Sequence, residues 1–386
     1  MKIVFIGTVI PPERNRTRFQ RALMLTENHD VYFVLRTEIC QDINIRCKES
    51  FVLGKKILNL DRLVFPIWAV WKSYLIIKRN HIDIIYSSRN DTSIIIGYLI
   101  KQQNIKWVVD IWDDIRLEVD NLKQYDEIKY RVFLYIKTIL YKVSKKLLKY
   151  SDLIILALSP KFIKYLEINE VKKINITNGV DLSLIRNHKF NSTEKKKTFE
   201  IIYVGHLSEN RGIKIILESA NILIRYISKV KINLIGNMNK ADREWLNKEI
   251  EKKNIKNCVS ISGEKSHEYI LKRIQRADIC LCILNPKVRN YRYAYPIKIF
   301  EYMAMGKVTV ATKLPGIEEI IEDNKNGILI SSGNPAQLSQ AILKIYFDKK
   351  LREKIEQNAM NDVRKYDWEI ISRKLNAQLN KMNLAH

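Results

Sequence analysis

The sequence lacks the short motifs that most directly identify an enzyme class. It has no G-x-x-x-x-G-K-[ST] phosphate loop, no G-x-G-x-x-G dinucleotide fingerprint and no G-x-S-x-G nucleophile turn. No Asp-x-Asp pair occurs, the nearest acidic pair being Asp113-Asp114, and the six histidines show no metal-ligand spacing. Redox, hydrolytic and metal-dependent chemistry therefore find no support in the sequence, and we expect no cofactor and no metal.

Disulfide motifs and long apolar runs are also missing. The five cysteines are an odd number without a C-x-x-C pair, which indicates reduced thiols and a cytoplasmic chain. The longest apolar run, "LVFPIWAVW" at 63–71, is far shorter than the roughly 20 residues that span a bilayer. The apolar N-terminal run ends at "PPER", so a buried first strand is favoured over a signal peptide.

Acidic residues are scarce relative to basic ones. The chain has 67 Lys and Arg against 42 Asp and Glu, a formal net charge of +25. Such a balance indicates an anionic partner, which includes nucleic acid, a membrane surface and a phosphate-bearing substrate. A general lysine bias, visible beside the abundant Ile and Asn, explains part of the excess.

The 386 residues are enough for two domains, and short apolar runs alternate with longer periodic segments throughout. This pattern predicts two doubly wound parallel sheets wrapped by helices, an α/β fold. A polar stretch predicts the division: a first domain at 1–188, a linker at 189–198 and a second domain at 199–366. The predicted strands are 2–7, 31–35, 82–87, 106–111, 153–158 and 173–177 in the first domain, and 201–205, 231–236, 259–263, 277–284, 308–312 and 327–330 in the second.

Three predicted strands of the second domain end in glycine, at Gly205, Gly236 and Gly263. Glycine lets the backbone approach a ligand closely, and doubly wound sheets bind ligands at the carboxyl edge of their strands. An ordinary turn explains any one of them, but three together favour a ligand-binding edge.

Two helix starts in the second domain suit an anion. Gly212 begins one helix, and Arg211 directly precedes it. A helix start presents free N–H groups and a positive dipole end. In "YPIKIFEYMAMGK" (295–307), Pro296 opens a second helix and Lys298 lies in its first turn. A cation there opposes the dipole, which makes sense if an anion binds beside it. Glu301, one turn on, can accept two hydrogen bonds from a vicinal diol such as a ribose.

Several segments together resemble one enzyme family. "YVGHLSENRGIKIILESANIL" (203–223), the 295–307 segment with "VTVAT" after it, and "ITNGVDL" (176–182) match its signatures in order and spacing. The chain resembles the retaining glycosyltransferases of family 4 over nearly its whole length. The resemblance implies the GT-B fold, two Rossmann-like domains facing across a cleft, with a C-terminal helix at about 367–386 packing back on the first domain.

The resemblance implies a nucleotide-diphosphate sugar donor in the second domain and a saccharide or lipid-linked saccharide acceptor in the first, in the synthesis of cell-surface polysaccharide or glycolipid. Glu301 would hold the donor ribose, and Arg211 stands where the family has a lysine for the diphosphate. The backbone of Pro296 and Ile297 would face the phosphates. On the acceptor side it points to Arg14, Asn15, Arg16, Trp112 and Asp113, of which Asp113 either positions the acceptor hydroxyl or caps a helix.

Two departures from the family pattern affect the donor site. Tyr293 stands eight residues before Glu301, where the family has a first glutamate that meets the donor sugar, and His206 replaces a common arginine. Lys298 supplies a cation instead. The expected mechanism is metal-independent, with Arg211, Lys298 and two helix starts stabilising the departing diphosphate. The family implies front-face attack, with the departing phosphate helping to take the acceptor proton.

The segment 129–150 holds seven Lys or Arg and no acid. We expect its apolar stripe of Val132, Ile136, Ile139, Val143 and Leu147 to pack on the first sheet. The basic face suits an anionic membrane surface, to which the chain would bind peripherally. The lysines expected to contact lipid are Lys142, Lys145, Lys146 and Lys149.

Three other functions stay open at this point. A nucleotide-sugar epimerase of the same fold would need acid–base groups that the sequence does not show. A non-catalytic partner subunit of a transferase is compatible with Tyr293. A nucleic-acid-binding protein would show interleaved aromatics or a known module, and neither is present, so no nucleic-acid partner is expected.

Overall fold

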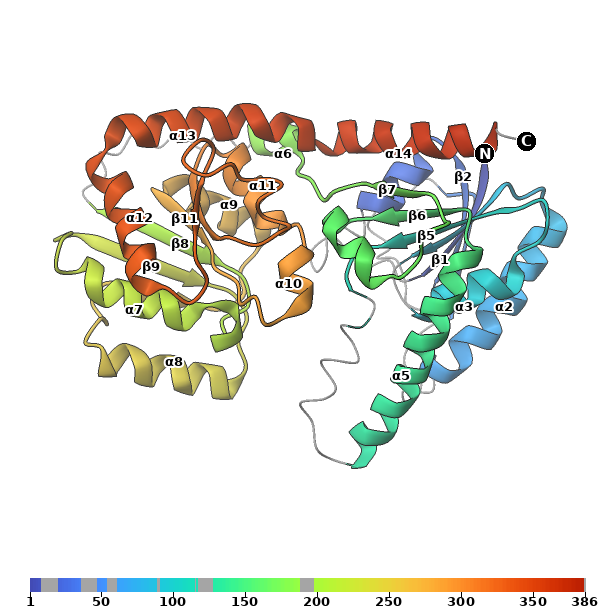
Figure 1. Cartoon of the computed structure of the whole chain (residues 1–386), viewed down its shortest axis with the longest axis horizontal. Coiled ribbons are helices and arrows are strands. Elements are labelled where there is room, and N and C mark those ends of the chain that lie inside the picture. Colours follow the sequence, from blue (N-terminus) through green and yellow to red (C-terminus); the bar gives the residue numbers. More distant parts are fainter. Residues whose placement is uncertain are drawn as a thin grey trace. The chain divides into compact units, whose positions relative to one another are not determined.

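The computed structural model describes residues 1–7, 20–35, 47–53, 61–88, 91–114, 116, 128–187 and 198–384. The chain divides into two compact units, which we describe separately (Figure 1). Unit 1 comprises Met1–Asn178 and Glu369–His386, and unit 2 comprises Gly179–Trp368. Sequence analysis placed the division ten residues later, at 188, and its linker at 189–198 lies outside the described residues except for Thr198.

Unit 1 is built on a seven-stranded parallel sheet with the order β3-β2-β1-β4-β5-β6-β7. The five central strands are buried on both faces because helices cover both sides, which explains their unbroken apolar sequences, whereas the edge strands β3 and β7 are partly exposed. Their bounds are β1 Lys2–Gly7, β2 Asp30–Leu35, β3 Glu49–Val52, β4 Ile84–Ser88, β5 Lys106–Ile111, β6 Leu153–Leu156 and β7 Lys173–Asn175.

Three helices of unit 1 lie side by side: α2 (Asp61–Arg79) and α3 (Asp91–Ile100) pack on the sheet, and α5 (Ile128–Leu147) packs beside α3 (Figure 1). The C-terminal helix α14 (Trp368–Asn383) joins unit 1 through Asn376, which bonds His29 Nε2 at 2.8 Å and the carbonyl of Met24 at 3.3 Å. Shorter helical segments are η1 Leu148–Tyr150, η2 Pro160–Tyr165 and residues 20–26.

Unit 2 contains a six-stranded parallel sheet with the order β10-β9-β8-β11-β12-β13. The order reverses between β8 and β11, which is the topological switch point where doubly wound sheets bind ligands. The strands are β8 Phe199–Val204, β9 Val230–Ile235, β10 Val259–Ser262, β11 Ile279–Cys282, β12 Val308–Thr312 and β13 Ile328–Ile330. The helices are α6 Leu182–Asn187, η3 Glu209–Arg211, α7 Ile213–Leu223, α8 Lys240–Lys252, α9 His267–Arg276, α10 Arg289–Tyr293, α11 Ile297–Ala304, α12 Pro335–Phe347, α13 Lys349–Asp362 and η4 Val363–Tyr366.

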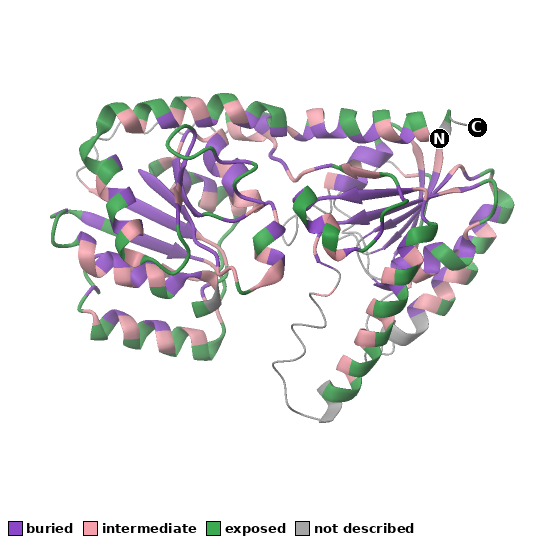
Figure 2. Ribbon diagram, viewed as in Figure 1, coloured by how far each residue is buried: buried purple, intermediate pink, exposed green. Residues whose placement is uncertain are grey.

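Successive strand residues of unit 2 point to opposite faces of the sheet and fill two hydrophobic layers. Ile201 and Leu281 pack with α7, α8 and α12 on one face, whereas Ile202 and Cys280 pack with α9 and with Tyr302 of α11 on the other. Figure 2 shows that the central strands of both units are buried. Because α9 and α11 lie on the same face, their first turns both reach the carboxyl edge of the sheet.

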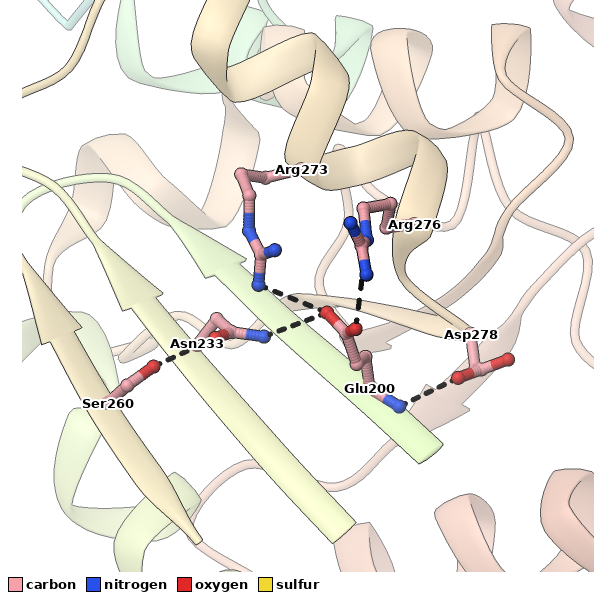
Figure 3. A network of polar contacts seen from close by, with 6 residues as sticks. All are labelled: Glu200, Asn233, Ser260, Arg273, Arg276 and Asp278. Atoms are coloured by element: carbon pink, nitrogen blue, oxygen red, sulfur yellow. Dashed lines mark hydrogen bonds and ion pairs between the residues drawn. The ribbon is translucent and has the colours of Figure 1, made fainter. Parts of the chain in front are cut away.

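A buried polar network holds the opposite, amino-terminal edge of this sheet (Figure 3). The carboxylate of Glu200 in β8 accepts from Arg273 at 3.0 Å and from Asn233 at 3.4 Å, and its backbone N–H donates to Asp278 at 2.7 Å. Arg276 lies 4.0 Å from the same carboxylate. Glu200 is only 7% exposed, and breaking such a buried charged pair costs about 3–5 kcal/mol, so the network ties α9 firmly to the strands.

Two features of unit 1 differ from the sequence-based expectation. The edge strand β3 was not predicted, because its four residues are partly exposed and carry no apolar run. The apolar stripe of α5 does not pack on the sheet: Val132, Ile136, Ile139 and Val143 are 57%, 42%, 43% and 39% exposed. The periodicity correctly identified residues that share one face of the helix, but it gave no information on whether the sheet covers that face.

Candidate functional site

Two glycines shape the carboxyl edge of unit 2's sheet. Gly205 follows β8 with φ +144° and Gly236 follows β9 with φ +154°, a backbone conformation that side chains disfavour. A Cβ at Gly236 would stand 1.8 Å from the carbonyl oxygen of Gly205, and one at Gly205 would stand 2.8 Å from Lys298 Nζ. Both positions therefore require glycine. A Cβ at Gly263 would meet nothing within 4 Å, so the chain's packing does not require glycine there.

Lys298, the second residue of α11, reaches into the space that Gly205 leaves. Its Nζ lies 4.4 Å from the centre of the Tyr203 ring, a cation–π contact. Burial lowers the pKa of Lys298, and the nearby charge of Arg211 lowers it further, while Cys282 and Glu301 oppose the shift. A partly buried ammonium group beside a second cation is unfavourable in the empty protein, and an anion would relieve that cost.

Arg211 closes η3 directly before Gly212, the residue that caps the start of α7 with φ +78°. Its guanidinium lies 4.3 Å from the centre of the Tyr291 ring, which fixes the cation without neutralising it. A Cβ at Gly212 would stand 2.6 Å from the Ile283 side chain, so glycine is required there for close packing as well as for its backbone conformation. Lys298 and Arg211 thus come from two helix starts and converge on the edge defined by Gly205.

Glu301 lies one turn beyond Lys298 on α11 and is paired with a residue that sequence analysis did not single out. Its Oε1 lies 2.7 Å from Nε2 of His267, the first residue of α9. The side chains of Glu301 and His267 are 14% and 32% exposed, so the pair is partly accessible to solvent. Sequence reasoning missed His267 because 34 residues separate the two, although its place at a helix start after the third strand glycine was a usable signal.

Pro296 and Ile297 stand at the start of the same helix. Pro296 is the residue that precedes α11, and Ile297 is the first helical residue, so the N–H groups of the first turn face the carboxyl edge of the sheet. His206 is farther out: it is 43% exposed and lies 3.6 Å from Asp242. Tyr293, at the position of the family's first glutamate, is 3% exposed in the hydrophobic interior.

The acceptor-side residues belong to unit 1, and only two of them lie in the described part of the chain. Trp112 and Asp113 directly follow β5, with Trp112 7% exposed and stacked at 5.7 Å by Arg21. Arg21 also lies 3.2 Å from the buried carboxylate of Asp110, whose pKa burial raises. The neighbouring Asp114 accepts a hydrogen bond from the backbone N–H of Arg116 at 3.0 Å. Arg14, Asn15 and Arg16 lie outside the described residues.

The four lysines predicted to contact lipid do not all have the same surroundings. Lys142, Lys146 and Lys149 are exposed, and Lys149 lies over the ring of Tyr150 at 4.9 Å. Lys145 is 20% exposed and its Nζ lies 2.9 Å from Glu167 Oε2, so its charge is already paired within unit 1.

Within the described residues there is neither a cluster of metal ligands nor a helix that could span a membrane. No group of three or more His, Cys, Asp or Glu side chains within that part of the chain is placed to hold a metal ion. Among the helices it contains, none is long and apolar enough to cross a membrane.

Replacing Lys298 with methionine tests whether the cation is there for an anion. Lys298→Met keeps the apolar stem, and we expect the free energy of unfolding at neutral pH to stay the same or rise by up to about 1 kcal/mol, because a cation in the first helical turn is unfavourable. Since the lowered pKa makes the charged form costly, any gain should shrink as the pH rises through that pKa. Pyrophosphate should raise the Tm of the wild type and not of the variant.

The control for this experiment is Lys349→Met, because the Lys349 side chain is 86% exposed on α13. It should change neither the stability nor the pyrophosphate response by more than the scatter typical of surface substitutions, about 0.5 kcal/mol. A Lys298→Met protein that is less stable and still responds to pyrophosphate would show that Lys298 is a structural residue.

Known proteins match both the sequence of unit 2 and the fold of the chain. Residues 185–362 match the family model described as glycosyl transferases group 1. The chain is 27% identical over 159 residues to an alpha-D-kanosaminyltransferase of Streptomyces kanamyceticus, which is 41% of this chain and 39% of that protein. It is 26% identical over 178 residues to an N,N'-diacetylbacillosaminyl-diphospho-undecaprenol alpha-1,3-N-acetylgalactosaminyltransferase of Campylobacter jejuni, which is 45% of this chain and 42% of that protein.

The chain thus matches less than half the length of either relative. The crystal structure of Anabaena Alr3699/HepE in complex with UDP superposes with a TM-score of 0.73 at 16% identity, and the match covers 99% of this chain and 100% of that one. A likeness at that identity establishes the fold. Residues 185–362 thus resemble the glycosyl transferases group 1 family, and the chain's two parallel-sheet units have the GT-B fold.

Proposed function

We propose that the chain is a retaining, metal-independent glycosyltransferase that takes a nucleotide-diphosphate sugar as donor and a saccharide or lipid-linked saccharide as acceptor. One observation carries the proposal. Lys298 at the start of α11 and Arg211 just before α7 lie near each other at the carboxyl edge of unit 2's sheet, beside Gly205. Glu301 lies one turn from Lys298. Two cations and a nearby carboxylate match a diphosphate joined to a ribose.

The relatives support the same donor class. The family model covers the whole donor-side constellation, since residues 185–362 include Gly205, Arg211, Lys298 and Glu301. The similar Anabaena protein was crystallised with UDP, and in another crystal with UDP-glucose. We infer a nucleotide of this general kind for our chain, with its diphosphate at Lys298 and Arg211 and its ribose at Glu301.

The proposed reaction stabilises a departing diphosphate with fixed charges of the protein. As the bond from the anomeric carbon to the diphosphate oxygen breaks, negative charge grows at the position that Lys298 and Arg211 approach. The acceptor oxygen bonds to the same face of the sugar, and its proton passes to the departing phosphate oxygen. Asp113 after β5 orients the acceptor hydroxyl in this scheme. The buried Tyr293 presents no carboxylate to the donor sugar, so sugar contact falls to other groups.

Turnover by the purified protein separates this proposal from a non-catalytic partner subunit. We expect release of the nucleoside diphosphate from one sugar donor, and no loss of rate in excess EDTA, because protein cations replace a metal at the diphosphate. The measurement is a coupled assay of nucleoside diphosphate with and without EDTA. A rate that EDTA abolishes and that Mg²⁺ or Mn²⁺ restores would contradict the metal-independent mechanism. Sugar epimerisation without transfer would favour the epimerase.

We further propose that the exposed face of α5 docks on an anionic membrane surface, which would bring unit 1 to a lipid-linked acceptor. This face carries four exposed apolar side chains, those of Val132, Ile136, Ile139 and Val143. The exposed cations Lys142, Lys146 and Lys149 lie beside them. Exposed helices on soluble proteins seldom carry such a stripe, and amphipathic helices with basic flanks lie in lipid interfaces. The neighbouring helices add further exposed apolar side chains: Ile67, Trp71 and Tyr74 of α2, and Tyr98 and Leu99 of α3.

Vesicle binding tests this surface. The protein should sediment with vesicles rich in anionic lipid at low salt and be released at high salt, since each cation near such a leaflet contributes roughly 1 kcal/mol that salt screens. Combined Lys142→Gln, Lys146→Gln and Lys149→Gln should abolish sedimentation. Combined Val132→Ser, Ile136→Ser and Ile139→Ser should weaken it at any salt concentration.

The matched control replaces three exposed lysines of unit 2 with glutamine, Lys214, Lys272 and Lys349, whose side chains are 52%, 50% and 86% exposed. This triple variant loses the same net charge and should still sediment. Equal loss of binding in both triple variants would reduce the effect to total charge and contradict a role for α5.

A further inference from the structure

The contact between His267 and Glu301 has a defined chemical direction. The Nε2 and Oε1 atoms are 2.7 Å apart, and an ionised carboxylate can only accept. His267 must therefore donate its Nε2–H to Glu301. One donated hydrogen bond leaves the second carboxylate oxygen and the remaining lone pairs of Oε1 available to a ligand, so the contact orients Glu301 without saturating it.

The fold holds His267 rigidly in this position. Ser266 caps α9 by accepting from the N–H of Tyr269 at 3.3 Å, which fixes the first turn where His267 lies. At the other end of the helix, Arg273 is bound to Glu200 in the buried network of Figure 3. The helix is thus anchored at both ends, and the imidazole is presented to α11 at the carboxyl edge of the sheet.

The pairing with His267 also keeps Glu301 from pairing with Lys298. Lys298 and Glu301 are three residues apart on α11, the spacing at which opposite charges pair on a helix. Yet the ion pair of Glu301 is made with His267, and the Lys298 ammonium instead lies over the Tyr203 ring. If Glu301 turned to Lys298, it would neutralise the cation and lose its own orientation.

We propose that His267 is a positioning residue that holds Glu301 for the two hydroxyls of the donor ribose and keeps it from pairing with Lys298. The inference rests on the proposed nucleotide role of Glu301. A carboxylate fixed through one oxygen meets a vicinal diol with little further loss of side-chain freedom. The role adds a residue of α9 to a donor site that the sequence assigned to α7 and α11.

A double-mutant cycle tests the proposal through binding. The probe is whichever of UDP, GDP, ADP and CDP raises the Tm of the wild type most, used beside its 2′,3′-dideoxy form, and Kd is measured by calorimetry. His267→Leu should raise the Kd of the ribonucleotide about tenfold, as expected for a hydrogen bond to a charged group. The dideoxynucleotide, which has no diol to bind, should lose at most about twofold.

Two further variants complete the cycle. Glu301→Gln should weaken binding of the ribonucleotide. Adding His267→Leu to this variant should cause no further loss of affinity, because the histidine acts through the carboxylate. His267→Gln supplies a side-chain N–H and should recover most of the affinity lost in His267→Leu. Thermal unfolding of each variant verifies that it folds, and His267→Gln keeps the test valid if leucine disturbs α9.

The outcomes distinguish this inference from the proposed function. Equal losses for the ribonucleotide and its dideoxy form in His267→Leu, or additive losses in the double variant, would overturn the positioning role. A wild-type protein that binds none of the nucleoside diphosphates would overturn the proposed function itself. If Glu301→Gln weakens the ribonucleotide and His267→Leu does not, the donor site stands and the inference fails.

Discussion

The carboxyl edge of unit 2's sheet depends on keeping a positive charge partly buried at the end of β8. Lys298 projects into the space above Gly205, and its ammonium lies on the Tyr203 ring while its pKa is lowered by burial and by Arg211. The neighbouring chain is arranged around that charge. Gly205 has a positive φ that favours glycine and leaves space for the ammonium, and Gly236 must lack a side chain to pass Gly205. An arrangement this costly to the empty protein is typical of a binding site that waits for an opposite charge.

Stability is supplied at the other edge of the same sheet. The carboxylate of Glu200, two arginines of α9 and the amide of Asn233 satisfy one another where the strands begin. Asp278 extends the network to α13 through Arg352 at 2.9 Å. The sheet therefore has a satisfied polar edge and a cationic edge. The helix α9 connects them, because the residues that anchor its last turn also fix the imidazole at its first.

The sequence predicts the fold well because the signal for it is local. Unbroken apolar strands with helices between them specify buried parallel sheets. All twelve predicted strands overlap observed ones, seven with both ends within one residue and five with an end shifted by two residues. The glycines after β8 and β9 and the wrong-sign cation Lys298 were also visible, since each conflicts with the conformation or charge that its position favours.

What the sequence does not predict depends on contacts between distant segments. The partner of Glu301 lies 34 residues away, and no periodicity connects the start of α9 to the middle of α11. The apolar stripe of α5 was assigned to the interior because periodicity shows which residues share a face and not what covers that face. Sequence analysis did not single out Tyr203 or Tyr291, and only the structure shows each ring lying under a cation.

The most direct test of the central claim is hydrogen–deuterium exchange on the intact protein, with and without the nucleoside diphosphate that stabilises it most. The account predicts slower exchange in peptides that cover residues 203–213 and 295–304, where Gly205, Arg211 and Lys298 lie, and at the first turn of α9. Peptides of α5 should be unaffected, because the nucleotide does not contact them. Protection confined to unit 1, or none at 203–213 and 295–304 under saturating nucleotide, would contradict a diphosphate site at the carboxyl edge of unit 2.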